Sequence, residues 1–373
     1  KLVHNPKANE KTIAKLPVQS LNGNKPVAHI NLWEVSSSIL DDGAPHRSFM
    51  QRQVTMMVGA LLATNQSISS LRINPGPGAE GGGVLEHLHV AHKSSLRLLD
   101  ISAIGLGDRG GPRLCELLGN GMCSMCTSIK LGNNKLTDAA IGLQLVEVLR
   151  SEQCTLTSVD MSGNEISGVI LARIVRTNTT LTSVDFRKNP IDDNALWLIG
   201  GLLLEEDCAC RLGALCTYAF EVEETATKLS LRDQSLAVGA ARCVIGVIKF
   251  NRSVTTLDLS GCGITVAAAN SLARALVHNT TLVALNLSNN PVSDVTNYKD
   301  SELEFSKSSF HQFAAAASNS ISLASLTLVG TPLPLPHIKG AGDLSSRSKV
   351  LDLSNQSLNP LSGILIGALV LQH

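Results

Sequence analysis

Apolar and polar residues alternate along this chain in a pattern that returns at a nearly fixed distance. The pattern is L-x-x-L-x-L-x-x-N/C-x-L, and it is clearest at 126–136, 156–166, 181–191, 254–264 and 282–292. Weaker copies are centred on Ile30, Leu71, Leu99, Leu229, Leu326 and Leu351. Most successive copies lie 25–30 residues apart, and three longer steps mark insertions. A period of this length is typical of a protein in which each repeat is one supersecondary unit.

Each repeat is predicted to hold a short strand, a turn and a helix. The template residues alternate between two sides, as they do in a half-buried strand. After the strand, the segment 265–279 has apolar residues at 266, 269, 272, 275 and 276, which is the spacing of one helix face. The segments 137–149, 237–249 and 362–371 follow the same spacing, and Thr137 is a predicted N-cap.

These repeats resemble the ribonuclease-inhibitor-like class of leucine-rich repeats. That class also includes the Ran GTPase-activating protein and the repeat arms of NOD-like receptors. The resemblance runs from about Ile30 to the end of the chain. It implies an α/β solenoid (a horseshoe) with a parallel concave sheet, outer helices and about 10–11 repeats with insertions. It is specific for fold and unspecific for function.

The long steps and the Pro/Gly-rich stretches suggest an organisation in blocks. We expect an irregular linker at 1–26, a first block of repeats at 27–207 and an irregular insertion at 208–225. A second block at 226–331 and a Pro/Gly linker at 332–347 would follow. The segment 348–373 reads as the start of a further, truncated repeat, since its helix has no polar cap, and we expect the native protein to continue beyond His373.

One template position calls for an amide at the end of the strand. It holds Asn134, Asn164, Asn189 and Asn290, and Cys262 replaces it once. A side-chain amide there can bond backbone groups of its own turn and of the neighbouring turn, whereas cysteine is a weaker partner. We therefore expect a structural ladder at these five positions.

The outward positions of the strands give a candidate binding face. The residue between the second and third apolar positions is, in successive copies, Asp100, Lys130, Asp160, Asp185, Asp258, Asn286 and Asp352, and its outward neighbours are mostly Ser and Thr. Because strands lie about 4.8 Å apart, this predicts a row of carboxylates over a hydroxyl-rich floor. Such a row would favour a basic protein partner. The alternative is that Asp belongs to the repeat itself and lies on a solvated face.

Composition and charge narrow the function further. Lys+Arg and Asp+Glu are both 31, so the formal charge is zero, which argues against a nucleic-acid partner. The longest apolar runs, 196–204 and 364–371, are far shorter than the roughly 18 residues of a membrane span. Nine cysteines, an odd count, favour free thiols in a reducing, cytoplasmic compartment.

Candidate chemistry along the chain stays incomplete. The pair Cys123 and Cys126 has no second pair at zinc-site spacing, and the histidines at 87, 89 and 92 have no completing ligand. The glycine-rich stretch 75–83 has no phosphate-binding lysine. N-glycosylation sequons, such as those at 178, 251 and 279, are better explained as by-products of the repeat. We therefore expect no enzyme, no metal and no cofactor.

The sequence favours a non-catalytic protein-interaction scaffold, a structural subunit of a larger assembly. By resemblance to repeat proteins of such assemblies, that assembly would be flagellar or cytoskeletal. Two alternatives stay open. One is a GTPase-activating regulator, for which Arg187, Lys188 and Asn189 are the nearest match to a catalytic loop. The other is the ligand-sensing repeat arm of a NOD-like receptor.

Overall fold

The computed structural model describes residues 29–31, 67–73, 85, 95–120, 125–293, 311–328, 332–335 and 363. The chain divides into two compact units, unit 1 (1–190) and unit 2 (191–373). The expected linker at 1–26, most of that at 332–347, and the expected repeat at 348–373 apart from residue 363 lie outside the described residues. The block boundaries at 207/208 and 225/226 stay a prediction.

Unit 1 is a series of short parallel strands, and helices follow the later ones. Neighbouring strands pair in chain order and in matched register, with Leu71 opposite Leu99 and Leu99 opposite Ile129. The strands are β1 (His29–Asn31), β2 (Ser70–Arg72), β3 (Leu98–Asp100), β4 (Ser128–Lys130), β5 (Ser158–Asp160) and β6 (Ser183–Asp185). The helices are α4 (Gly107–Gly119), α5 (Asp138–Arg150) and α6 (Gly168–Thr177). The predicted α/β repeat with a parallel sheet is confirmed.

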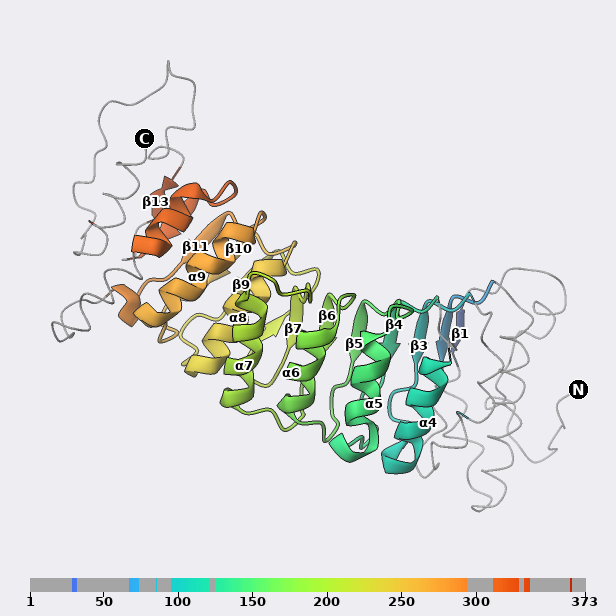
Figure 1. The fold of residues 1–373 in the computed structure, drawn as a ribbon. Coiled ribbons are helices and arrows are strands. Elements are labelled where there is room, and N and C mark those ends of the chain that lie inside the picture. Colours follow the sequence, from blue (N-terminus) through green and yellow to red (C-terminus); the bar gives the residue numbers. More distant parts are fainter. Residues whose placement is uncertain are drawn as a thin grey trace, which may run out of the picture. The chain divides into compact units, whose positions relative to one another are not determined.

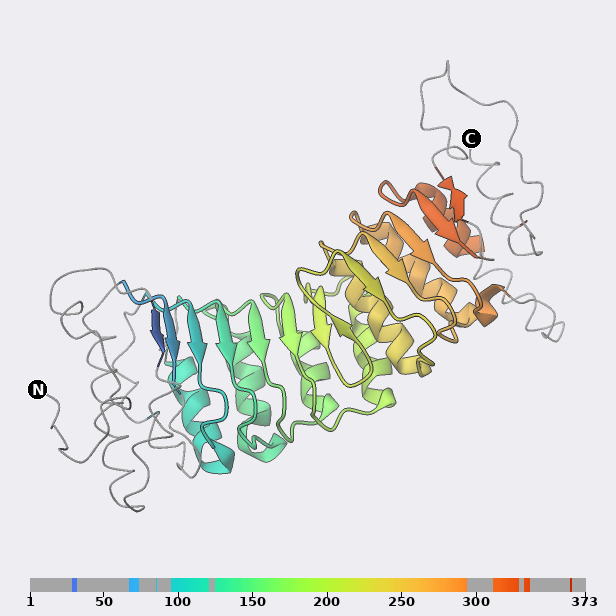
Figure 2. The same cartoon turned by 180° about the vertical axis from the view of Figure 1, so that it is seen from behind.

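The helices of unit 1 cover one face of its strands, and the other face is open in the part of the chain that the structure describes (Figures 1 and 2). The central residues of β2 to β6, such as Ile129 and Val159, are buried, and so are Leu145 and Leu171 on the helices. Burying a side chain of this size contributes about 1.5–3 kcal/mol. The core of unit 1 therefore lies between strands and helices. Thr137 is the N-cap of α5, where its hydroxyl accepts the N–H of Ala140.

Seven of the strands are followed by a turn with a left-handed residue at the same position. It lies four positions after the centre of the strand, with φ between 56° and 66°, at Ala103, Asn133, Gly163, Lys188, Asp233, Gly261 and Asn289. At Gly163 a Cβ would also overlap the Asn133 side chain of the preceding turn. Glycine is the residue that tolerates both demands.

Unit 2 repeats the design with one irregular step. Its parallel strands are β9 (Lys228–Ser230), β10 (Thr256–Asp258), β11 (Ala284–Asn286) and β12 (Ser325–Thr327), followed by β13 (Pro332–Pro334), which pairs antiparallel with β12. The helices are α7 (Asp193–Leu204), α8 (Val238–Phe250) and α9 (Val266–His278), with a short 3₁₀ turn, η4 (Pro291–Ser293), and residues 311–319 before β12 are also helical. Three residues of the expected Pro/Gly linker thus form a strand.

The long step between β6 and β9 contains a strand pair where the sequence suggests only an irregular insertion. β7 (Ala214–Cys216) pairs antiparallel with β8 (Glu221–Val222), and no helix lies between β7 and β9. Leu215 and Val222 face each other in this pair and both are buried. The segment 212–216 therefore supplies a buried strand of the repeat type without a helix of its own.

Because that helix is missing, α7 packs directly on α8 at backbone distance. A Cβ on Gly200 of α7 would lie 2.6 Å from the backbone of Arg242 and Cys243. A Cβ on Gly246 of α8 would lie 3.0 Å from the Gly200 carbonyl oxygen. Only residues without a side chain allow two helix backbones to come this close.

At the same contact, a polar side chain of each helix bonds backbone groups at one end of the other helix. The Asp193 carboxylate at the start of α7 accepts the N–H groups of Gly239 (2.9 Å) and Ala240 (2.8 Å), which begin α8. The Nζ of Lys249 on α8 donates to the carbonyls of Leu203 (3.1 Å) and Glu205 (2.6 Å), which end α7. Lys249 is buried, so these bonds satisfy a charge that would otherwise be costly to desolvate.

Candidate functional site

The open face of the unit 1 sheet brings the predicted outward residues into one row. The register places Arg72 opposite Asp100, Asp100 opposite Lys130, and then Asp160 and Asp185 in sequence. Arg72 was not among the predicted face residues. The weak repeat copy at Leu71 places it at the same template position, and this is the signal that could have found it.

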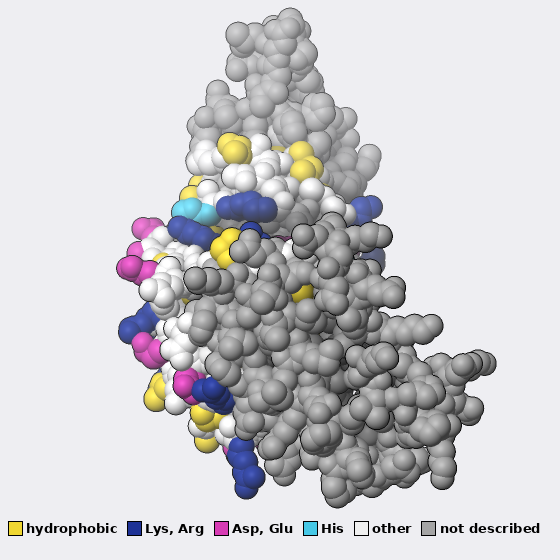
Figure 3. Space-filling view, turned by 90° about the vertical axis from the view of Figure 1, so that its right-hand side faces the viewer, with side chains coloured by type: hydrophobic (Ala, Val, Ile, Leu, Met, Phe, Trp, Pro, Cys, Tyr) yellow, Lys and Arg dark blue, Asp and Glu magenta, His cyan; other side chains and the backbone are white. Residues whose placement is uncertain are grey.

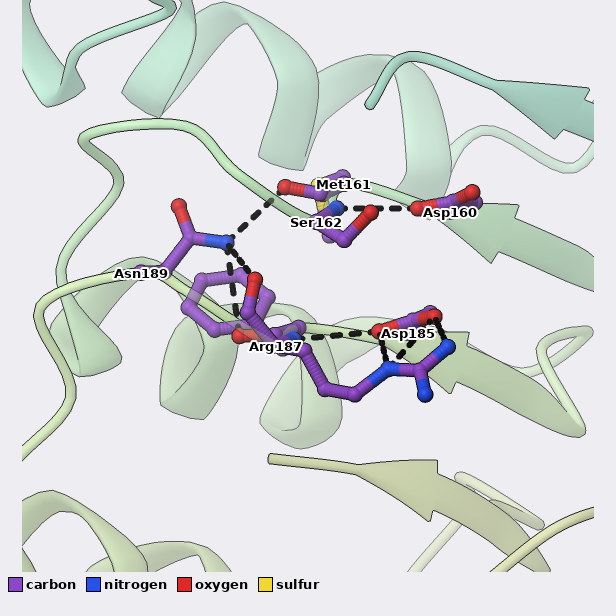
Figure 4. A network of polar contacts seen from close by, with 7 residues as sticks. Asp160, Met161, Ser162, Asp185, Arg187 and Asn189 are labelled. Carbon is purple, nitrogen blue, oxygen red and sulfur yellow. Dashed lines mark hydrogen bonds and ion pairs between the residues drawn. The ribbon is translucent and has the colours of Figure 1, made fainter. Parts of the chain in front are cut away.

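Each acidic or amide side chain of the row is fastened to its own turn. The Oδ1 atom accepts the N–H of the residue two positions further along, at 2.9–3.1 Å, in Asp100, Asp160, Asp185, Asp258 and Asn286. Figure 4 shows this bond at Asp160 and Asp185. The side chains are therefore held at the end of the strand, and little conformational entropy remains to be lost when a partner binds.

The unit 1 row is not a simple line of carboxylates, because cations compensate two of them. The Arg72 guanidinium lies 3.1 Å from the Asp100 carboxylate, and that of Arg187 lies 2.6 Å from Asp185 (Figure 4). Lys130 is exposed between Asp100 and Asp160 in the register. The face of unit 1 is thus of mixed charge.

The equivalent row in unit 2 is more neutral. The register places Ser230 opposite Asp258, Asp258 opposite Asn286, and Asn286 opposite Thr327. Asp258 is also held by the Ser260 hydroxyl, which donates to it at 2.6 Å. The predicted face residue Asp352 lies outside the described residues.

The hydroxyl floor beside the row is engaged with the backbone. Thr157 Oγ1 donates to the Thr127 carbonyl and Thr182 Oγ1 to the Thr157 carbonyl, both at 3.2 Å. Thr255 Oγ1 donates to the Thr227 carbonyl at 3.1 Å in unit 2. These hydroxyls stiffen the sheet, and their remaining lone pairs can accept bonds from a partner.

The residues of the predicted ladder lie in the turns that follow the strands of this face. In unit 1, Asn164 Nδ2 donates to the carbonyls of Met161 (2.8 Å) and Leu131 (3.1 Å). Its Oδ1 accepts the N–H groups of Asn134 (3.0 Å) and Leu136 (3.1 Å). Each such amide joins one turn to the preceding one, and Figure 4 shows Asn189 donating to Met161 in the same way.

In unit 2 the ladder has one weaker member. Asn290 Nδ2 donates to the Leu259 carbonyl (2.7 Å), and its Oδ1 accepts the Ile264 N–H (2.9 Å). Cys262 has only its thiol, which donates to the Leu231 carbonyl. A thiol carries one weak donor where the amide carries two donors and an acceptor.

A second asparagine ladder, at the C-terminal ends of the helices, was not recognised from the sequence. Its members are buried, and their Nδ2 atoms donate to backbone carbonyls at 2.6–2.7 Å: Asn178, Asn251 and Asn279. Their Oδ1 atoms accept N–H groups two and three residues on, such as those of Thr180 and Leu181. All three lie in sequons, and the amide nitrogen that would carry a glycan is already used in the fold.

The candidate reactive groups do not assemble into a chemical site. Among the described residues there is no cluster of His, Cys, Asp and Glu that could hold a metal ion. Cys126 is buried, whereas Cys123, the histidines at 87, 89 and 92 and the stretch 75–83 lie outside the described part. Burial raises the pKa of the Cys115 and Cys210 thiols to about 12, so both are protonated and unreactive near neutral pH.

No helix in the described part of the chain combines the length and apolar character needed to cross a membrane.

Comparison with known proteins agrees with this architecture. Residues 152–175, 177–196, 250–273 and 278–295 match a family model described as Leucine Rich repeat. NACHT, LRR and PYD domains-containing protein 5 of Homo sapiens is 26% identical over 259 residues, which are 64% of this chain and 21% of that protein. Ribonuclease inhibitor of Sus scrofa is 26% identical over 218 residues, 55% of this chain and 42% of the inhibitor. The chain therefore spans less than half the length of either relative.

Among solved structures, the leucine-rich repeat-containing protein LegL7 of Legionella pneumophila is 16% identical. The match covers 88% of this chain and 96% of LegL7, with a TM-score of 0.41.

Leucine-rich repeats are in general non-catalytic interaction domains. The repeat period, the strand register and the curated relatives together identify the chain as an α/β leucine-rich-repeat solenoid, similar to the repeats of ribonuclease inhibitor and of the NACHT, LRR and PYD proteins.

Proposed function

We propose that this chain is a non-catalytic protein-interaction module that acts as a scaffold in a larger assembly. The observation that carries the proposal is the open face of the unit 1 sheet. Its charged side chains are fixed in one row by Asx-type bonds, and no helix covers that face in the described part of the chain. A rigid polar surface of this kind recognises a partner through complementary charges rather than through chemistry on a substrate.

The partner we propose for unit 1 is a protein surface of mixed charge. Asp160 has no ion pair among the described residues, so a basic group of the partner can meet it. Lys130, which is exposed beside it, calls for an acidic group. The basic partner expected from the sequence thus keeps support at Asp160 and, in unit 2, at Asp258. The neutral charge of the chain supports a protein over a nucleic acid.

The cellular location of the chain and the kind of assembly it joins are proposed from resemblance alone. We propose a cytoplasmic, flagellar or cytoskeletal assembly because repeat proteins of this kind are common in such assemblies. The similarity to NACHT, LRR and PYD proteins favours a second candidate, the repeat arm of a larger receptor-like protein. The GTPase-activating alternative gains no support, because Asp185 holds the Arg187 guanidinium through both Nε and the terminal nitrogen.

Site-directed photo-cross-linking in the native source tests the proposal. A photoreactive residue at Ser158, in the middle of the face, is compared with one at Gln144, which is exposed on α5. We expect cross-links from position 158 to a fixed set of proteins that stay associated in high salt. Lys130→Glu should weaken this cross-linking by about tenfold.

Three results would contradict it. Equal cross-linking from positions 158 and 144 would mean that the face is not used. Recovery of a small GTPase only in its nucleotide-bound form would favour the regulator. Cross-links to nucleic acid would refute a protein partner.

A further inference from the structure

A tryptophan and an arginine form an exposed stack on the helix side of unit 2. The Arg242 guanidinium on α8 lies 3.9 Å from the centre of the Trp197 ring on α7. Trp197 is 46% exposed, and the chain has only two tryptophans. Tryptophan and arginine are also the residues most enriched at binding hot spots.

The stack is held rigidly by the close helix contact beneath it. A Cβ on Gly201 would lie 3.0–3.3 Å from the Arg242 guanidinium, so the flat group rests over the bare backbone of α7. Gly200, one residue earlier, brings the two helix backbones together. A surface whose geometry is fixed before binding loses less entropy when a partner arrives.

Charges of both signs lie near the stack, and two of the cations have no carboxylate partner among the described residues. Arg242 and Arg274 make no hydrogen bond or ion pair with another described residue, apart from the stack on Trp197. Burial, and then the nearby Arg274, lower the pKa of Arg242, whereas Glu205 raises it. Guanidinium groups of the same charge repel each other, and an anion bound beside them would relieve this repulsion.

Further charged groups lie near the end of α9. Burial, and then Lys249 and Arg211, lower the pKa of His278, so these cations lie within electrostatic reach of one another. In Figure 3, Lys and Arg side chains (dark blue) lie beside a histidine (cyan), and Asp and Glu side chains (magenta) lie next to them on the described surface. The acidic residues Glu205 and Glu206 lie in the same region.

Apolar side chains adjoin the stack and restrict the kind of partner. Leu198, the next residue of α7, is 44% exposed. Val238, one helical turn before Arg242, is 56% exposed. A partner therefore gains from covering apolar surface as well as from supplying carboxylates.

We propose that the α7–α8 surface formed by Trp197, Leu198, Val238 and Arg242, extended by Arg274, is a docking site for an acidic amphipathic segment of a partner protein. An apolar side chain of that segment packs against Trp197 and Leu198, and its carboxylates bond Arg242 and Arg274. This surface lies on the helices, and the face proposed above is formed by the strands, so each can fail without the other.

Fluorescence titration of Trp197 tests the docking site directly. In the full chain, Trp33→Phe leaves Trp197 as the single tryptophan. The probes are a synthetic helical peptide with Glu and Leu on opposite faces and its counterpart with Lys in place of Glu. We expect a saturable change with the acidic peptide, weakened by at least about tenfold in Arg242→Gln/Arg274→Gln, and none with the basic peptide.

Two further variants separate binding from folding. Arg242→Lys keeps the charge but loses the planar fork, so it should bind between the parent and the double variant. Arg173→Gln/Arg176→Gln removes two arginines of α6, both exposed, and should leave the titration unchanged. Circular dichroism confirms that each variant is folded.

The proposal is overturned by any of three outcomes. One is no saturable change with the acidic peptide up to about 1 mM. Another is equal binding of the two peptides, or equal binding by the parent and the double variant. The third is tighter binding of a single-stranded oligonucleotide than of the acidic peptide, which would make nucleic acid the ligand.

Discussion

Unit 1 and unit 2 are built from the same repeat, yet they are held together differently. In unit 1 the turns are joined by buried amides, each bonded to the turn before it, and helix glycines such as Gly111 and Gly142 lie mainly against side chains of the next helix. In unit 2 one ladder position is a thiol, and one step has a strand pair in place of a helix. There α7 and α8 meet through glycines.

This difference shows which contacts stabilise a repeat array. In an array of complete repeats the stability is spread evenly, because each repeat contacts its neighbours through the same bonds. Where a helix is missing, a single helix-to-helix contact has to replace what the absent element would have buried. We therefore expect unit 2 to depend on a few positions and unit 1 to depend on many equivalent ones.

The largest effect is expected at the helix contact of unit 2. Gly200→Val would place a branched side chain against the backbone of α8, and should lower the free energy of unfolding of unit 2 by more than about 3 kcal/mol. In unit 1, a Cβ at Gly119 would make only an ordinary contact of 3.7 Å with Val148, so Gly119→Ala should change stability by less than about 1 kcal/mol. Urea unfolding followed by hydrogen exchange on peptides from each unit measures both. Similar losses would mean that the two units do not differ in this way.

The ladder gives the next largest effect, and here unit 1 should be the more sensitive. Asn164→Ala leaves two buried N–H groups and three carbonyls without this partner, at a cost of about 3 kcal/mol. Cys262→Ala removes one weak bond and should cost about 1 kcal/mol. Gln144→Ala, at an exposed position, is the control. The midpoints of urea unfolding measure the three variants. A greater loss of stability in Cys262→Ala than in Asn164→Ala would contradict the expected difference between the units.

Alkaline pH should weaken unit 2 more than unit 1. Burial raises the pKa of Cys115 in unit 1 and of Cys208, Cys210, Cys243 and Cys262 in unit 2 above the ordinary value of 9.0. Each buried thiol thus contributes stability that is present below pH 9 and is lost as the pH rises toward its folded-state pKa. At pH 9 the loss is up to about 0.4 kcal/mol per thiol, or about 1.6 kcal/mol for unit 2.

Hydrogen exchange at pH 7.5 and pH 9, corrected for the intrinsic exchange rate, measures this loss of stability in each unit. Cys243→Ser in unit 2 is a poor control because it buries a hydroxyl, so Cys243→Ala is the better one. Cys243→Ala should make the stability of unit 2 depend less on pH. An equal response of the two units to pH would be evidence against the role of the thiols.

The smallest effect concerns the exposed stack. Arg242→Gln removes a cation–π contact and should lower the stability of unit 2 by about 0.5–1 kcal/mol. Arg173→Gln on α6 should have an effect below about 0.5 kcal/mol. Thermal unfolding of both variants is the measurement. A cost at Arg242 above about 2 kcal/mol would make it a structural residue rather than a docking residue.

Much of the fold could be predicted because its signals are local. The apolar period located the strands at Ile129, Val159 and Leu257, and the helical spacing after them located α5 and α9. The capping role of Thr137 follows from its own side chain. The β7 strand escaped prediction because it precedes the next strand without a helix, so it breaks the period that makes other strands visible.

The sequence predicts where the residues of the candidate face lie, but it does not predict which of their charges are compensated. The template locates Asp100, Asp160 and Asp185 in one row, but their compensation depends on neighbours. Arg72 reaches Asp100 from the preceding strand, and Arg187 folds back on Asp185 within its own turn. Neither choice of side-chain direction is encoded in the spacing of apolar residues.

The sequence by itself determined the repeat, its strand and helix order and the buried amide positions, because each of these depends on residues within one period. Only the tertiary structure decided that α7 packs on α8, that Asp193 caps that helix and Lys249 binds the end of α7, and that Trp197 stacks on Arg242. These contacts join residues about 45 positions apart, across a step whose missing helix no local pattern records. Burial and close packing are properties of the surroundings of a residue, and those surroundings exist only once the chain has folded.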